Sequence, residues 1–115
     1  MISDHFAVHS PLGLVLGLII AHFLGDFALQ SSAMARGKVP GGDPHVAWGW
    51  WLCSHASTHA FLVMLLTGSW VLSVAEWGTH AWIDHAKINR QITFTVDQAL
   101  HLGLKLVWAA LALSA

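Results

Sequence analysis

The sequence has few charged side chains. Aspartate, glutamate, lysine and arginine make up 10% of its 115 residues, against roughly 25% in an average soluble domain. So few charges could not cover the surface of a soluble protein of this length, and 56% of the residues are hydrophobic. The scarcity of charge therefore excludes an ordinary soluble domain and favours a protein that lies in a membrane.

Cysteine and an excess of basic charge are also missing. Cys53 is the only cysteine, so an intrachain disulfide is excluded and a thiolate-rich Cu(I) or iron–sulfur site is disfavoured. The formal net charge is -1, and no run of lysine or arginine offers the basic surface that nucleic acid requires. We therefore expect no nucleic-acid partner.

Four long apolar stretches make up most of the chain. They cover residues 11–30, 48–67, 69–88 and 94–114, and about 20 residues is the length that crosses a bilayer core of roughly 30 Å as an α-helix. Loops rich in glycine, proline or polar residues separate them. The sequence predicts an all-α fold, namely a four-helix transmembrane bundle. We expect residues 1–115 to form a single integral membrane domain, with the lipid bilayer as the partner of the protein.

Basic residues lie in the first and third connections of this bundle. Arg36 and Lys38 follow the first stretch, and Lys87 and Arg90 follow the third. In an up-and-down bundle these two connections face the same side of the membrane, and the positive-inside rule assigns that side to the cytoplasm. We expect a protein of the bacterial inner membrane with both termini outside.

Ionisable side chains recur inside the apolar stretches at steps of about four residues. Such a step returns to nearly the same face of an α-helix, so each stretch carries one polar stripe. In chain order the stripes are His22, Asp26 and Gln30; His55 and His59; Glu76, His80, Asp84 and Lys87; and Asp97, His101 and Lys105. The expected topology places the stripes at a similar depth in the membrane. Charged side chains within a bilayer are more stable when they face the bundle interior than when they face lipid. The sequence therefore predicts one buried polar site near the cytoplasmic side.

The chemistry of the stripes favours a metal site. Imidazole and carboxylate ligands suit Zn, Mn, Fe or Ni, and a His-x-x-x-His pair on one helix can place two nitrogens on one ion. The predicted metal ligands are His22, His55, His59, His80, Asp84 and His101, and the predicted further ligands or general bases are Asp26 and Asp97. We expect one or two divalent ions, Zn or Mn/Fe, as the cofactor. The enzyme class that this suggests is a membrane-bound metal-dependent hydrolase with a lipid-linked substrate.

Two functions without catalysis remain alternatives. The same groups could form a proton- or ion-conducting path, or a hydrogen-bonded polar core in a structural membrane subunit. The outer halves of the stretches, around residues 63–66 and 107–113, are apolar. A conducting path needs polar groups across the whole membrane, so these apolar ends favour a closed site over a pore.

The segment from His22 to Gln30 reads His-Phe-Leu-Gly-Asp-Phe-Ala-Leu-Gln. It resembles the His-x-x-Gly-Asp-Phe-x-Leu-Gln signature of a family of small bacterial and phage membrane proteins, known only as a domain of unknown function. The His-x-x-x-His, His-x-x-Ile-Asp-x-x-Lys and Asp-Gln-x-x-His motifs that begin at His55, His80 and Asp97 follow in the same order as in that family. The resemblance covers about residues 12–110 and implies no activity. Membrane-bound metal-dependent hydrolases are similar by analogy alone.

Overall fold

The computed structural model describes residues 8–114. The regular elements in this part of the chain are helices: α2 (Pro11–Phe23), η1 (Leu24–Ala28), α3 (Ser32–Gly37), α4 (Trp48–Thr67), α5 (Trp70–Ile88) and α6 (Phe94–Ser114). The expectation of an all-α fold is confirmed. Because η1 continues α2 as a turn of π-helix, the long helices begin and end within about two residues of the four apolar stretches.

Serine side chains begin two of the long helices. Ser10 accepts a hydrogen bond from the Gly13 N–H at 3.3 Å, and Pro11 takes the first position of α2, where its missing N–H costs nothing. Ser69 accepts from the Leu72 N–H at 3.1 Å and begins α5 in the same way. These caps define where each of the two helices starts.

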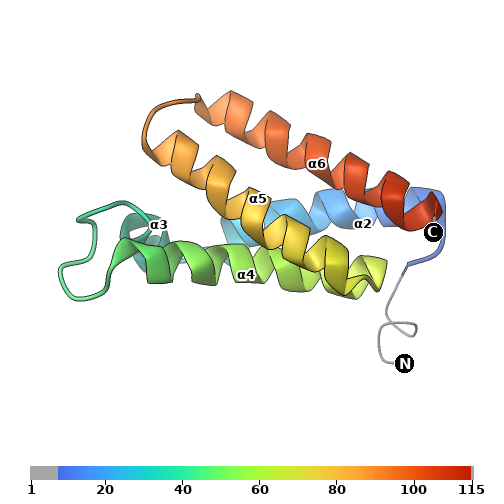
Figure 1. Cartoon of the computed structure of the whole chain (residues 1–115), viewed down its shortest axis with the longest axis horizontal. Coiled ribbons are helices and arrows are strands. Elements are labelled where there is room, and N and C mark those ends of the chain that lie inside the picture. Colours follow the sequence, from blue (N-terminus) through green and yellow to red (C-terminus); the bar gives the residue numbers. More distant parts are fainter. Residues whose placement is uncertain (1–7, 115) are drawn as a thin grey trace.

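The α4–α5 connection is a tight turn. Gly68 ends α4 in the left-handed conformation, with a φ of 71°, which a residue without a Cβ adopts without strain. Its N–H donates to the Met64 carbonyl at 2.8 Å. The turn reverses the chain, so that α5 runs back along α4 as its main packing partner (Figure 1).

The long helices alternate in direction. Figure 1 shows α3 and the α5–α6 connection at one end of the bundle, and the α4–α5 turn and the end of α6 at the other. The first and third connections therefore lie at the same end, as the up-and-down topology requires. The predicted outside position of the N-terminus concerns residues 1–7, which lie outside the described part of the chain.

The interior of the bundle is divided along its length. Near the α4–α5 turn the buried side chains are apolar, and we call this cluster the apolar half: Leu14, Leu18, Val63, Leu72, Trp108 and Ala109. Towards the other end most of the buried side chains are polar. We call this set the polar half: His22, Asp26, Lys38, His55, His59, Glu76, His80, Asp84, Asp97, His101 and Lys105.

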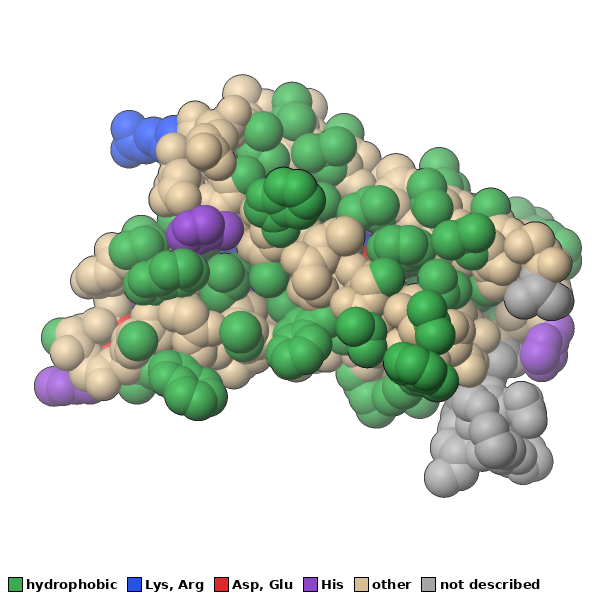
Figure 2. Space-filling model, viewed as in Figure 1, with side chains coloured by type: hydrophobic (Ala, Val, Ile, Leu, Met, Phe, Trp, Pro, Cys, Tyr) green, Lys and Arg blue, Asp and Glu red, His purple; other side chains and the backbone are tan. Residues whose placement is uncertain are grey.

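The outer surface of the bundle is mostly apolar. Trp50, Trp70 and Trp82 are 71% to 77% exposed, and large hydrophobic side chains point outward from all four long helices. Figure 2 shows hydrophobic side chains over much of the visible face. Two segments, Pro11–Ala28 and Phe94–Ser114, are long and apolar enough to cross a membrane. That α4 and α5 cross with them stays a prediction.

Candidate metal centre

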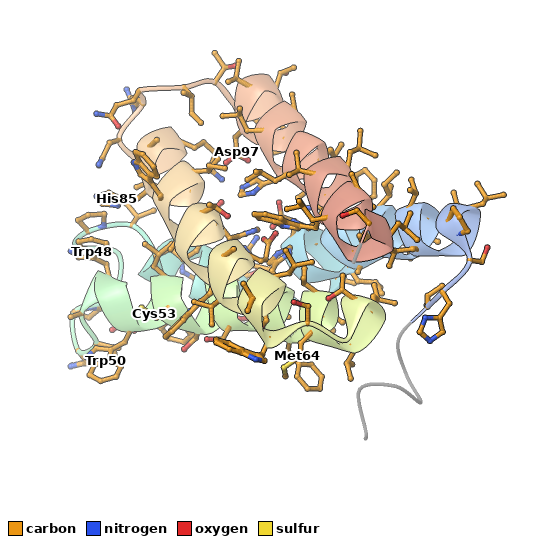
Figure 3. All side chains as sticks on the ribbon, turned by 45° about the vertical axis from the view of Figure 1, so that its right-hand side comes forward. Trp48, Trp50, Cys53, Met64, His85 and Asp97 are labelled. Carbon is orange, nitrogen blue, oxygen red and sulfur yellow. The ribbon has the colours of Figure 1, made fainter. Side chains whose placement is uncertain are left out.

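Every long helix contributes side chains to one buried cluster in the polar half. The members are His22 and Asp26 from α2 and η1, His55 and His59 from α4, Glu76, His80 and Asp84 from α5, and Asp97, His101 and Lys105 from α6. Figure 3 shows Asp97 on the inner side of α6, whereas Trp50 lies on the outer side of α4. The structure therefore brings together all eight residues that the sequence suggested as ligands or bases, although their roles stay predictions.

Asp26 lies on a local widening of its helix. In η1 the Leu29 N–H donates to the Leu24 carbonyl at 2.7 Å, one residue further back than in an α-helix. The neighbouring Gly25 lies against the ring of His59, and a Cβ built on it would be 2.5 Å from the ring carbon Cε1. A glycine is therefore needed for η1 and α4 to approach so closely. The wide turn and the close approach bring the Asp26 carboxylate to the histidines of α4.

Four potential ligand atoms from three helices gather around one point, which we call the primary site: Asp26, His55, His59 and His80, each offering one atom within 4.8 Å of the others. Asp26 Oδ1 lies 3.1 Å from His55 Nε2 and 2.9 Å from His59 Nε2. It lies 3.5 Å from His80 Nε2, which is 3.2 Å from His55 Nε2. A tetrahedral zinc ion with bonds near 2.0–2.1 Å holds its ligand atoms roughly 3.3 Å apart. The measured separations lie on either side of that value, so the residues present fit a metal ion.

Glu76 orients His80 from the side away from the primary site. Its Oε2 lies 2.9 Å from His80 Nδ1, so we assign the ring proton to Nδ1, which leaves the Nε2 lone pair facing the primary site. The other oxygen, Oε1, accepts from Lys105 Nζ at 2.7 Å and from Trp108 Nε1 at 2.8 Å. Glu76 therefore supports a ligand of the primary site and is itself held by two donors of α6.

Three imidazole rings of the cluster form a stack. The ring of His80 lies between those of His59 and His101, with centroid separations of 3.7 Å and 4.0 Å. Imidazolium ions at such distances would repel each other. The stack therefore disfavours protonation of neighbouring rings at the same time, and the neutral ring is the form of histidine that binds a metal.

Asp84 is held by a lysine that reaches in from the first connection. Lys38 follows α3, is 4% exposed, and places Nζ 2.9 Å from Asp84 Oδ2. The other oxygen of Asp84 accepts from His101 Nε2 at 3.3 Å. Lys38 is one of the four basic residues on which the predicted orientation rests. It lies in the first connection as expected, but it is buried in an ion pair, so the exposed basic residues that support this orientation are fewer.

The segment between α3 and α4 positions Lys38. Gly37 lies against the indole of Trp51, and a Cβ at this glycine would clash with that ring. Trp51 Nε1 in turn donates to Asp43 Oδ2 at 2.9 Å. The His45 backbone N–H donates to Asp43 as well and, with the Trp51 bond, holds the pKa of this carboxyl below its ordinary value. These contacts tie the segment to the start of α4, which directs Lys38 into the interior.

Gln98 joins the carboxylates of two helices. Its Nε2 donates to Asp26 Oδ2 at 2.9 Å and to Asp97 Oδ2 at 3.1 Å. Its Oε1 lies 2.8 Å from His22 Nε2, which acts as the donor. In the sequence Gln98 is part of the Asp-Gln-x-x-His motif, and the spacing of the stripes predicts no role for it. The feature of the sequence that could have indicated a role for Gln98 is its polar amide next to Asp97 in an otherwise apolar stretch.

Two stripe residues lie at the edge of the cluster or outside it. Lys87 Nζ is 5.9 Å from the centre of the Phe94 ring, so it is Lys38 and not Lys87 that pairs with Asp84. Gln30 donates to the backbone carbonyl of Asp26 at 2.9 Å and thereby steadies the end of η1. The spacing of four residues placed Lys105 in the interior correctly, but it included Lys87 in a stripe and did not predict the buried position of Lys38.

Several buried atoms of the cluster have no hydrogen-bond partner within residues 8–114, among them His59 Nε2 and Asp97 Oδ1. His59 Nε2 is close to Asp26 Oδ1, and Asp97 Oδ1 is 3.3 Å from His101 Nε2, but neither contact has hydrogen-bond geometry. A buried polar group without a partner costs roughly 1–3 kcal/mol. Both atoms belong to residues in groups that could hold a metal ion.

Lysines neutralise two of the four buried carboxylates. The pairs are Lys105 with Glu76, at 2.7 Å, and Lys38 with Asp84, at 2.9 Å. In the described part of the chain, the charged partners of Asp26 and Asp97 are histidines alone. With neutral imidazoles, two negative charges of the cluster are therefore left without a cation.

One family model matches residues 14–114, and that family is described as a protein of unknown function (DUF3307). The chain belongs to this family. The resemblance inferred from the motifs is thereby confirmed, and the match includes every residue of the DUF3307 protein that lies in the cluster. Comparison with curated proteins and with solved structures found no match. The function therefore has to be inferred from the site itself.

Proposed function

We propose that this DUF3307 protein is an integral membrane protein that binds a divalent metal ion at the primary site. The observation that carries the proposal is the convergence of one carboxylate oxygen and three imidazole nitrogens in a buried position. Three histidines with one carboxylate suit Zn, Mn or Fe. The ion would be held by Asp26, His55, His59 and His80. Glu76 would orient His80, and Asp84 would lie beside the ligand histidines.

The distribution of polarity supports a location in the membrane. Polar side chains occupy half of the interior, whereas large apolar side chains cover the outside (Figure 2). A soluble protein rarely exposes apolar surface on this scale. In a bilayer the same surface faces lipid, and ionisable groups turn inward towards partners. We propose that α4 and α5 cross the membrane with the two more apolar segments, because their polar stripes face the bundle interior.

The charge of the cluster supports a divalent cation over a neutral ligand. Asp26 and Asp97 leave two negative charges that no lysine or arginine of residues 8–114 neutralises. Buried charge without a counterion is costly in a medium of low dielectric constant. One divalent ion supplies two positive charges, which equals the deficit.

Hydrolysis of a lipid-linked substrate is the activity that we propose for this site. A bound divalent ion supplies a water of lowered pKa and polarises the bond to be cleaved. Of the two residues first suggested as general bases, Asp26 belongs to the ligand set. Asp97 Oδ1 is free of hydrogen bonds from the described residues and could accept a proton or bind a further ion.

Elemental analysis tests the proposal. The protein would be purified in detergent without chelators and without a polyhistidine tag, and we expect at least one Zn, Mn or Fe per chain. His59→Ala should lower this content several-fold. His85→Ala is the matched control, because His85 stacks on Trp48 with ring centroids 4.5 Å apart and lies outside the cluster (Figure 3).

A protein without bound metal would contradict the proposal. If the protein contains no stoichiometric metal and gains no thermal stability when Zn, Mn or Fe is added, metal binding is wrong. Proton flux through liposomes that contain the protein would then separate the two remaining functions. Flux would indicate a conducting path, and its absence a structural subunit with a hydrogen-bonded core.

A further inference from the structure

We infer that the cluster binds a second divalent cation, held by Asp97 and His101, which shares Asp26 with the primary site. This inference rests on the proposed metal binding and extends it to a centre of two ions. Asp26, Asp97 and His101 each offer a ligand atom within 4.8 Å of the other two. All three side chains are buried, so that the group is enclosed by the bundle.

Asp97 offers the atom that most needs a ligand. Its Oδ2 accepts from Gln98 at 3.1 Å, whereas Oδ1 has no hydrogen-bond partner in residues 8–114. The residue is 0% exposed, so bulk water cannot compensate the free oxygen. An uncompensated carboxylate oxygen at such a position is costly. A cation at Oδ1 would remove this cost.

His101 lies where it could complete the second site. Its Nε2 is 3.3 Å from Asp97 Oδ1 and also 3.3 Å from Asp84 Oδ1. One ring N–H donates to one acceptor at a time, and the geometry favours Asp84. If Nε2 binds a cation instead, both carboxylate oxygens are at the spacing of neighbouring ligands in a coordination shell. His101 Nε2 and the two carboxylate oxygens can therefore either share a proton or bind a metal ion.

Asp26 and Gln98 join the two sites. Asp26 directs Oδ1 to the primary site, while Oδ2 accepts from Gln98, which also donates to Asp97. The rings of His80 and His101, one from each site, stack at 4.0 Å. Two-metal sites hold their ions roughly 3.5–4 Å apart, a distance that a shared carboxylate can span. Two divalent ions would exceed the charge of Asp26 and Asp97, so we expect an anion between them.

Loading the full-length protein in detergent with Mn²⁺ tests this inference. We expect two Mn²⁺ per chain by elemental analysis, and an electron paramagnetic resonance spectrum of two exchange-coupled ions. Asp97→Asn should reduce the content from two ions to one and change the spectrum to that of an isolated ion. His101→Gln should do the same, which covers the case that Asp97→Asn does not fold. Asp43→Asn is the control for the loss of one carboxylate and should keep two coupled ions.

The outcomes separate the second site from the first. One uncoupled Mn²⁺ in the unmodified protein would overturn the second site and leave the primary site in place, with Asp97 then free to act as a base. No bound Mn²⁺, Zn or Fe would overturn both. Two coupled ions that persist in both Asp97→Asn and His101→Gln would show that the second ion has other ligands, which also contradicts the inference.

Discussion

In the apolar half of the bundle, Leu14, Leu18 and Val63 fill the space between the helices and are at most 1% exposed. In the polar half, Glu76 and Lys105 are buried to a similar degree, but their contact is a 2.7 Å ion pair. The first kind of contact is a sum of many small attractions without strict direction. The second depends on partners in defined positions, because each charge is stable in the interior only while its partner is present.

This difference indicates what each half contributes. In lipid, close packing holds helices together without help from water, so the apolar half can fix the relative positions of the helices. The polar half then uses these positions to gather ligand atoms. We expect the apolar half to lose stability gradually when altered, and the polar half to lose stability and metal binding together.

The largest effect should follow the loss of Glu76. Glu76→Ala leaves Lys105 as a buried charge without its partner, and removes the acceptor of His80, so we expect a loss of about 3–5 kcal/mol of unfolding free energy and a loss of metal. Chemical unfolding in detergent micelles measures the first effect. The double variant Glu76→Leu with Lys105→Met should recover much of the stability but not the metal. A cost below about 1 kcal/mol for Glu76→Ala would contradict the proposed difference between the two halves, because a cost this small is typical of exposed ion pairs.

The second-largest effect should follow the loss of a large side chain from the apolar half. Leu18→Ala creates a cavity beside Val63 and Trp108 in the apolar cluster, and a substitution of this kind costs about 2 kcal/mol or more. Metal content per folded chain should stay unchanged, because no atom of the primary site moves. Metal lost from the folded variant would show that the two halves are not separable.

Gly25→Ala tests the close approach of η1 and α4. The new methyl group would meet the His59 ring, so the ring must move away from Asp26, and we expect a destabilisation of about 1–3 kcal/mol with a lower metal content. Gly103→Ala is the matched control, because a Cβ there meets no described atom within 4 Å. That variant should be neutral or slightly stabilising, since alanine favours the helix. Normal metal content in Gly25→Ala would mean that the primary site does not depend on this contact.

The smallest effect belongs to the loop that precedes α4. The pKa of Asp43 is lowered in the folded protein because the ionised carboxyl accepts hydrogen bonds from His45 and Trp51. The stabilisation is therefore complete above the ordinary pKa of 3.8 and is lost as the pH falls through the lowered value. The Val46 backbone N–H also donates to Asp43 Oδ1, at 3.1 Å. Asp43→Asn should speed hydrogen exchange of the His45 and Val46 amides at neutral pH and leave the metal content unchanged. Exchange rates equal to those of the unmodified protein would show that these hydrogen bonds do not order the loop.

Much of the helical layout could be read from local patterns. The length of each apolar stretch and the caps at Ser10 and Ser69 depend on neighbouring residues alone, so the helix bounds agree with the expectation within about two residues. The π-helical turn around Asp26 could not be read in this way. Its cause is the packing of η1 against α4, which the local sequence does not describe.

The residues of the candidate site could be predicted from the sequence, but the contacts between them could not. Spacing placed His59, His80 and Asp97 on inward faces, because a step of four residues is a property of one helix. The roles of Lys38 and Gln98 as partners of the buried carboxylates were not predicted, since the first is in a loop and the second is off the main stripe. The match to the DUF3307 family confirmed the family that the motifs suggested, but it added no chemistry.

By itself the sequence determined that the chain forms apolar helices with one polar face each, because hydropathy, helix length and a period of 3.6 residues are local quantities. The packing of the helices was needed to show that Asp26 meets the histidines of two other helices, and that within residues 8–114 lysines neutralise Glu76 and Asp84 but neither Asp26 nor Asp97. The physical reason is that a contact between atoms depends on distances and rotations between helices to within an ångström. Those are set by the packing of residues far apart in the chain, such as Gly25 against His59.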